Sequence, residues 1–147
     1  MQSITQYYEQ DHDRLDDLFK QFQQLKGQDR TQAGERFRQF KEGLLRHIAW
    51  EEEILFPAFD GKNGLEGMGP TEVMRREHAQ IKGRLSEIDR QLCSGGESAP
   101  AEEALAATLE VHNHKEEGIL YPAIDGQLSE QEVREIFSRM EQLGTPR

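Results

Sequence analysis

One pattern occurs twice in this chain, and it constrains the fold more than any other feature. The segment that starts at His47 reads HIAWEEEILFPAFDG, and the segment that starts at His112 reads HNHKEEGILYPAIDG, with nine of 15 positions identical. Upstream, His12 and His78 are each preceded by an acidic residue and followed three positions later by an aliphatic one. Self-similarity at a fixed offset is typical of repeated supersecondary units. We therefore expect two helix pairs of one design.

Apolar residues recur at helical spacing through most of the chain, and no segment of any length shows the alternation of a strand. Capping residues, prolines and glycines mark the expected helix ends. The resulting helices run from Ser3 or Thr5 to Gly27, from Thr31 to Gly61, from Pro70 and Thr71 to Cys93, from Ser98 and Pro100 to about Asp125, and from Ser129 to Met140. The apolar seam of the fourth is expected to contain Leu105, Leu109, Ile119 and Leu120.

These helices predict an all-α fold. The four long ones would form an up-down-up-down bundle over about residues 4–126, internally duplicated, and a short C-terminal fifth helix over about 130–142 would pack across it. A chain of 147 residues is long enough for one domain with a sizeable core and too short for two ordinary ones. We therefore predict a single domain over residues 1–147.

The composition excludes several classes of function. The 28 acidic and 18 basic residues give a formal charge of −10, which repels nucleic-acid phosphates and anionic lipids. The sequence has no long apolar run and no signal peptide, so we predict a cytoplasmic protein without a membrane partner. Cys93, the single cysteine, excludes cysteine-rich zinc and iron–sulfur sites and is predicted to be a spectator.

The repeated segments place histidine and glutamate where the helical pattern demands apolar residues. His47 and Glu51 lie one turn apart, and His112 and Glu116 repeat that spacing. In an antiparallel bundle, the early histidines of the first and third helices reach the same level as these pairs. A buried charged cluster is costly unless a cation compensates it. The predicted metal ligands are His12, His47, Glu51, His78, His112 and Glu116.

Simpler interpretations exist for each of these residues. A single HxxxE pair is more often a surface ion pair, but two copies with matching histidines at one depth favour a metal site. His114 is predicted to face solvent, and Trp50 to form a wall of the core. Glu52 and Glu117 are predicted to be surface charges with the reach to contact the ligands. Imidazole and carboxylate together suit iron or manganese, and carboxylates from opposed helices can bridge two ions.

The order of these residues resembles that of the hemerythrin-like, or HHE cation-binding, family. That family has the pattern H…HxxxE…H…HxxxE, matched over roughly residues 4–126 by His12, His47-x-x-x-Glu51, His78 and His112-x-x-x-Glu116. The resemblance implies an oxo- or hydroxo-bridged pair of iron ions. It also implies that Glu51 and Glu116 bridge the ions, that His12 and His47 hold one, and that His78 and His112 hold the other.

The chain departs from the oxygen-carrying members of that family at two places. Their additional histidine, one turn before the third-helix histidine, is replaced by Met74, a poor ligand for iron. Their last motif is HxxxxD, whereas this chain has HxxxE followed by Glu117. Both ions would then keep an open position. Tyr8, one turn before His12, is a candidate to ligate a metal, donate a proton or carry a radical.

Several functional hypotheses follow from the residues and the resemblance. The first is a module that binds or senses dioxygen, nitric oxide or iron, with a separate protein partner if it is a sensor. The second is an enzyme that decomposes peroxide at the open metal pair. A ferritin-class protein is disfavoured because that class has Glu-x-x-His on two helices, and Arg75 occupies the required position before His78. The last is a metal-free acidic interaction bundle.

Overall fold

A computed structural model describes residues 2–143, and every regular element within them is helical, which confirms the predicted all-α class. The elements in chain order are α1 (Ile4–Leu25), α2 (Arg30–Trp50), η1 (Glu51–Leu55), α3 (Phe56–Asn63), α4 (Pro70–Ser94), α5 (Ala99–Lys115), η2 (Glu116–Leu120), α6 (Tyr121–Asp125) and α7 (Glu130–Leu143). η1 and η2 are π-helical turns that join their neighbours without a break. The second and fourth predicted helices are therefore α2-η1-α3 and α5-η2-α6.

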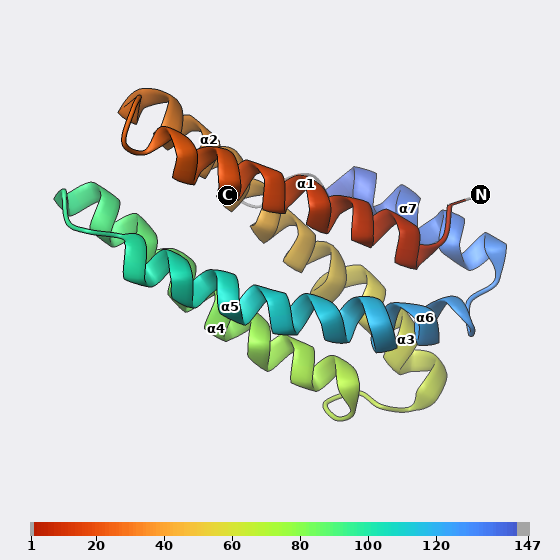
Figure 1. The fold of residues 1–147 in the computed structure, drawn as a ribbon. Coiled ribbons are helices and arrows are strands. Elements are labelled where there is room, and N and C mark those ends of the chain that lie inside the picture. The colour runs from red at the N-terminus through yellow and green to blue at the C-terminus, as the bar shows by residue number, and fades with distance from the viewer. Residues whose placement is uncertain (1, 144–147) are drawn as a thin grey trace.

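The long helical segments lie side by side (Figure 1). α1 packs along α2, α4 packs along α5, and α6 and η2 contact α1. α7 packs on η1 and on the start of α1, where the ring centroids of Phe137 and Tyr7 are 4.9 Å apart. Trp50 is buried under α7 and donates a hydrogen bond to the Met140 carbonyl at 3.2 Å, as expected for a core wall.

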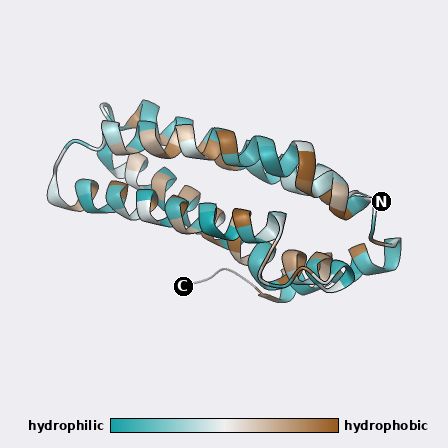
Figure 2. Cartoon of the chain, turned by 90° about the horizontal axis from the view of Figure 1, so that it is seen from below, coloured by the Kyte–Doolittle hydropathy of each residue, from teal (hydrophilic) through white to brown (hydrophobic). Residues whose placement is uncertain are grey.

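Hydrophobic and hydrophilic residues alternate along the helices, as expected when one face of each helix is buried (Figure 2). No helix in the described part of the chain has the length and apolarity needed to cross a membrane.

The helix ends follow the capping signals with small shifts. Ser3 and Gln6 form a capping box at α1, and Ser129 and Glu132 exchange the same pair of bonds before α7. The second helix begins at Arg30 rather than Thr31, because the Asp29 side chain accepts a hydrogen bond from the Gln32 N–H. It ends later than predicted. Gly61 lies inside α3, and the left-handed residue that closes the helix is Gly64, with φ 63°.

Each π-turn is followed by an aromatic residue and then a proline. Proline has no N–H to donate and crowds the preceding turn of an α-helix. Pro57 and Pro122 follow residues whose N–H groups bond five positions back, Phe56 to the Glu51 carbonyl and Tyr121 to the Glu116 carbonyl. The wider turn accommodates the proline without breaking the helix. It also rotates the following residues, so that Phe56 and Tyr121 are both fully buried.

The same rotation explains why one prediction was wrong. Ile119 was expected in the apolar seam of the fourth helix, but its side chain is 68% exposed. The straight α-helical spacing that places it there does not apply inside η2. Ile54, which holds the matching position in η1, is buried in one apolar cluster with Val133 and Met140 of α7. The described chain has no second helix of that kind over η2.

The aspartate that ends each repeated segment ties it to the start of another helix. Asp125 accepts hydrogen bonds from the N–H groups of Ile4 and Thr5 at 2.9 and 3.0 Å, and from the Thr5 hydroxyl at 2.6 Å. Asp60 accepts hydrogen bonds from the Thr71 hydroxyl in the first turn of α4. A carboxylate at a helix N-terminus satisfies free N–H groups and complements the helix dipole. The repeated Asp-Gly therefore ties the end of α3 to the start of α4 and the end of α6 to the start of α1.

We expect the substitution Asp125→Ala to lower the free energy of unfolding by about 1–3 kcal/mol, because three donors at the start of α1 lose their acceptor. Urea denaturation monitored by circular dichroism measures the change. Asp13→Ala removes the same charge from an exposed position of α1 and is expected to change stability by less than about 0.5 kcal/mol. Equal effects of the two substitutions would contradict the anchoring role.

Candidate metal centre

The structure brings all six predicted ligands together at one level of the core. They lie on α1, at the end of α2 and start of η1, on α4, and at the end of α5 and start of η2. None is more than 4% exposed: His12, His47, Glu51, His78, His112 and Glu116. One apolar cluster packs on the α7 side of this polar layer and another on the side of the α1–α2 and α4–α5 connections. Polar side chains at this depth require compensation.

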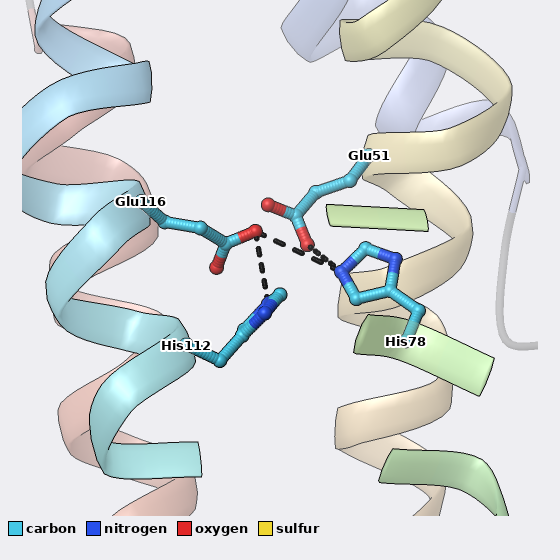
Figure 3. Close-up of side chains that lie close together, drawn as sticks. All are labelled: Glu51, His78, His112 and Glu116. Atoms are coloured by element: carbon cyan, nitrogen blue, oxygen red, sulfur yellow. Dashed lines mark ion pairs between the residues drawn. The ribbon is translucent and has the colours of Figure 1, made fainter. Parts of the chain in front are cut away.

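The six side chains form two groups that share one glutamate. In the first, His78 Nε2 lies 3.2 Å from Glu51 Oε1 and 3.7 Å from Glu116 Oε2, and His112 Nε2 lies 3.2 Å from Glu116 Oε2 (Figure 3). In the second, His12 Nε2 lies 3.3 Å from Glu116 Oε1. Within each group, the potential ligand atoms are all within 4.8 Å of one another.

The second group consists of His12, His47 and Glu116. Glu116 directs one oxygen toward each group, because Oε1 faces His12 and Oε2 faces His112. Glu51 also approaches both groups through the same oxygen, with Oε1 3.5 Å from His47 Nε2 and 3.2 Å from His78 Nε2. The arrangement offers room for two cations with carboxylates between them.

Each of the four histidines is oriented by a carboxylate on its outer side. The Nδ1 atoms of His12, His47, His78 and His112 lie 2.6, 2.8, 2.7 and 2.8 Å from carboxylate oxygens of Glu117, Asp11, Glu52 and Glu77, respectively. An acceptor at Nδ1 holds the proton there and directs the lone pair of Nε2 inward, which is the arrangement of metal-binding histidines.

Two of these four carboxylates were identified from the sequence and two were not. Glu52 and Glu117 were expected to have the reach to contact the ligands, and they do. Asp11 and Glu77 were noticed only as the acidic residues that precede His12 and His78. Each orients the histidine of the neighbouring helix, His47 or His112, rather than the one beside it in sequence. That pairing depends on helix packing.

Three atoms at the centre have no hydrogen-bond partner although they are buried: Glu51 Oε1, His78 Nε2 and Glu116 Oε2. His78 Nε2 and Glu51 Oε1 are 3.2 Å apart, but their orientation does not make a hydrogen bond. Buried polar atoms without partners are rare and require an explanation. Donor atoms that converge in this way fit a cation.

The charges of the centre shift the pKa values of its residues strongly. Burial raises the pKa of Glu51 to about 8, and the nearby Glu116 carboxylate adds to the increase. Burial by itself lowers the pKa of His12, but hydrogen bonds with Glu116 and Glu117 raise it to about 9. At His78, burial also lowers the pKa, but the surrounding carboxylates outweigh this effect and raise the pKa to about 11. Protons thus supply the positive charge that a cation would bring.

The two remaining histidines differ from each other. Burial lowers the pKa of His47 to about 4, and the hydrogen bond with Asp11 only partly offsets this. The pKa of His112 is raised, because the Glu116 carboxylate, 3.2 Å from its Nε2, outweighs the effect of burial. A neutral histidine is the form that binds a metal.

A tyrosine that sequence reasoning did not assign to the site occupies its centre. The Tyr121 hydroxyl lies 2.7 Å from Glu51 Oε2 and 2.9 Å from Glu116 Oε1, and it can donate its single proton to either oxygen. The available signal was the aromatic position that the two repeats share, Phe56 in one and Tyr121 in the other. Tyr8, the tyrosine singled out from the sequence, instead directs its hydroxyl to Met140 Sδ at 3.4 Å. Its ring packs edge-on against His47.

Other residues lie as the sequence indicated. His114 is exposed, and Met74 is buried in the apolar cluster on the α7 side of the site.

Comparison with known proteins agrees with this geometry. The family model described as the hemerythrin HHE cation-binding domain matches residues 3–143. Over 103 residues, the chain is 31% identical to an uncharacterised hemerythrin-like protein of Schizosaccharomyces pombe, covering 70% of this chain and 51% of that protein. Over 133 residues, it is 28% identical to a DNA nickase of Nostoc, covering 90% of this chain and 36% of the nickase. No solved structure matches it significantly.

The family match spans nearly the whole sequence, so the chain belongs to the hemerythrin HHE cation-binding family. The chain spans about half the length of the yeast relative and about a third of the nickase.

We expect the metal-free protein to become less stable as the pH rises from 6.5 to 9. The folded-state pKa values of His12 and His78 lie above the ordinary value of 6.5, so their contribution to stability is complete below pH 6.5. It decreases as the pH rises, and it is lost by about pH 9 for His12 and about pH 11 for His78. The lowered pKa of His47 acts below pH 6.5, outside this interval.

Thermal unfolding followed by circular dichroism at both pH values tests this. A bound metal replaces these protons, so the metal-loaded protein should lose much less of its melting temperature over the same interval. A metal-free melting temperature that is constant or rises toward pH 9 would contradict the assigned protonation.

Proposed function

We propose that this chain is a non-haem di-iron protein that binds or senses dioxygen, nitric oxide or iron. Glu51 and Glu116 would bridge the two ions, with His12 and His47 on one and His78 and His112 on the other. The observation that carries the proposal is the pair of buried donor groups that share Glu116 and leave three inward atoms without a hydrogen-bond partner.

Iron is favoured by the donor chemistry and by the family. Nitrogen and carboxylate oxygen donors without cysteine suit iron or manganese better than the soft metals. Four outer carboxylates and the two central glutamates also surround the site with negative charge, which suits a pair of multivalent cations.

The protein residues have separate tasks in this proposal. The outer carboxylates hold the imidazoles in place, and the apolar clusters on both sides exclude water. The side chains of Glu52 and Glu117 are 27% and 28% exposed, so each connects a buried histidine to solvent and can pass a proton. An iron pair in this position would supply a redox-active centre with room for a small ligand.

The overall arrangement belongs to the same proposal. We propose that the four long helical segments are an up-down-up-down bundle made of two duplicated halves. The support is that the contacts recur at the offsets of the sequence repeat: Asp125 with Thr5 and Asp60 with Thr71, and Glu117 with His12 and Glu52 with His78. Each half contributes equivalent groups to the centre.

The alternative function is peroxide decomposition. It is favoured by the Tyr121 hydroxyl at hydrogen-bond distance from both central glutamates, which places an exchangeable proton in the site. Met74, in place of the additional histidine of the oxygen carriers, would also leave one metal position without a protein ligand. DNA nicking, the activity named for the Nostoc relative, is not proposed, because a charge of −10 repels the phosphate backbone.

We expect the anaerobically loaded protein to bind about two iron ions per chain, as in other bundles with paired carboxylates. Glu116→Ala should lose both, because Glu116 belongs to both donor groups. Metal analysis after gel filtration measures the content. Glu110→Ala changes an exposed glutamate of the same helix and should retain two ions. A wild-type chain without iron, or a Glu116→Ala variant that keeps both ions, would contradict the proposal.

Reactions of the reduced iron protein separate the two functions. A binding or sensing protein should show absorption changes with dioxygen or nitric oxide that reverse when the gas is removed. Immediate and irreversible oxidation would exclude a carrier. The enzyme hypothesis predicts oxygen evolution from peroxide at a rate well above that of the same concentration of free iron. It is abandoned if the two rates are equal.

A further inference from the structure

The Tyr121 hydroxyl is surrounded by candidate ligand atoms. It lies 2.9 Å from Glu116 Oε1, 3.2 Å from His47 Nε2 and 3.5 Å from His12 Nε2. It is also 2.7 Å from Glu51 Oε2. Tyr121 is fully buried, so no water competes for these contacts. The Tyr121 hydroxyl is therefore in direct contact with the group made by His12, His47 and Glu116.

The two donor groups differ in their number of donor atoms. The group around His78 and His112 includes both glutamates and has four donors, whereas the group around His12 and His47 includes only Glu116 and has three. The Tyr121 oxygen is 2.9–3.5 Å from each of those three. Atoms bonded to one ion at about 2.0–2.2 Å lie about 3 Å from each other. The phenol oxygen therefore occupies the position of a further donor to this group, in addition to Glu51 as the proposed bridge.

The other half of the molecule has no such oxygen. Phe56 holds the corresponding place after η1, and its ring stacks on His78 with an interplanar angle of 9°. Both residues are directed inward by equivalent π-turns, so at this position the two halves differ by one hydroxyl group.

We propose that the Tyr121 oxygen is a protein ligand of the ion held by His12 and His47. This inference rests on the proposed di-iron site. On coordination, the ferric ion takes the place of the phenol proton, which leaves to solvent, and no electron is transferred. The two ions are then inequivalent. The ion held by His12 and His47 has an additional protein ligand, and the ion held by His78 and His112 keeps the open position for an external ligand.

Visible absorption and resonance Raman spectra of the ferric protein test this, because phenolate bound to ferric iron gives a charge-transfer band and enhanced tyrosine ring vibrations. The comparison uses wild type, Tyr121→Phe and a Tyr7→Phe/Tyr8→Phe double variant in which Tyr121 is the only tyrosine of the chain. Iron content and circular dichroism are measured on every sample. Tyr121→Phe is a conservative change, because phenylalanine already stands at the matching position of the first repeat, Phe56.

We expect the band in wild type and in the double variant, and its complete loss in Tyr121→Phe at unchanged iron content. Phe56→Tyr should add a second phenolate contribution. A wild-type protein that holds two ferric ions without the band, or a band that persists in Tyr121→Phe, overturns the inference and leaves the di-iron site standing. A wild type that holds no iron overturns both. If Tyr121→Phe fails to fold, the double variant decides alone, because loss of its band excludes Tyr121.

Discussion

The burial of two carboxylates side by side is the constraint on which the rest of the structure depends. Glu51 and Glu116 are fully buried, and two carboxylates side by side at this depth are stable only if one keeps a proton or positive charge lies beside them. The surrounding histidines provide it as protons in the metal-free chain, and the outer carboxylates then balance the histidines. The centre is thus a layered charge arrangement that forms only when four helical segments meet at one level.

The helices are adapted to that centre by their π-turns. In a straight α-helix, the residue one turn beyond each central glutamate would be Leu55 or Leu120. The five-residue turn places Phe56 and Tyr121 there instead, while Leu55 and Leu120 stay buried in the adjoining apolar cluster, and the prolines that follow favour the wider turn. One local irregularity therefore both accommodates the proline and selects which aromatic side chain contacts the site.

The two repeated segments of the sequence differ in their surroundings. α7 covers η1 and buries Ile54, whereas Ile119 of η2 is exposed. Tyr121 provides a hydroxyl where Phe56 has none. Because these differences lie at equivalent positions of the sequence repeat, they are the places where the proposed metal pair would have unequal surroundings.

The sequence by itself determined the helical class, the approximate helix ends and all six central residues. It could do so because the 3.6-residue period and the HxxxE spacing are local properties, and because the repeat removed the ambiguity of each single motif. The partners Asp11 and Glu77, the inward position of Tyr121 and the exposure of Ile119 were decided by the tertiary structure. The first two depend on which helices become neighbours, and the others on a change of helical pitch within five residues. Side-chain periodicity alone contains neither kind of information.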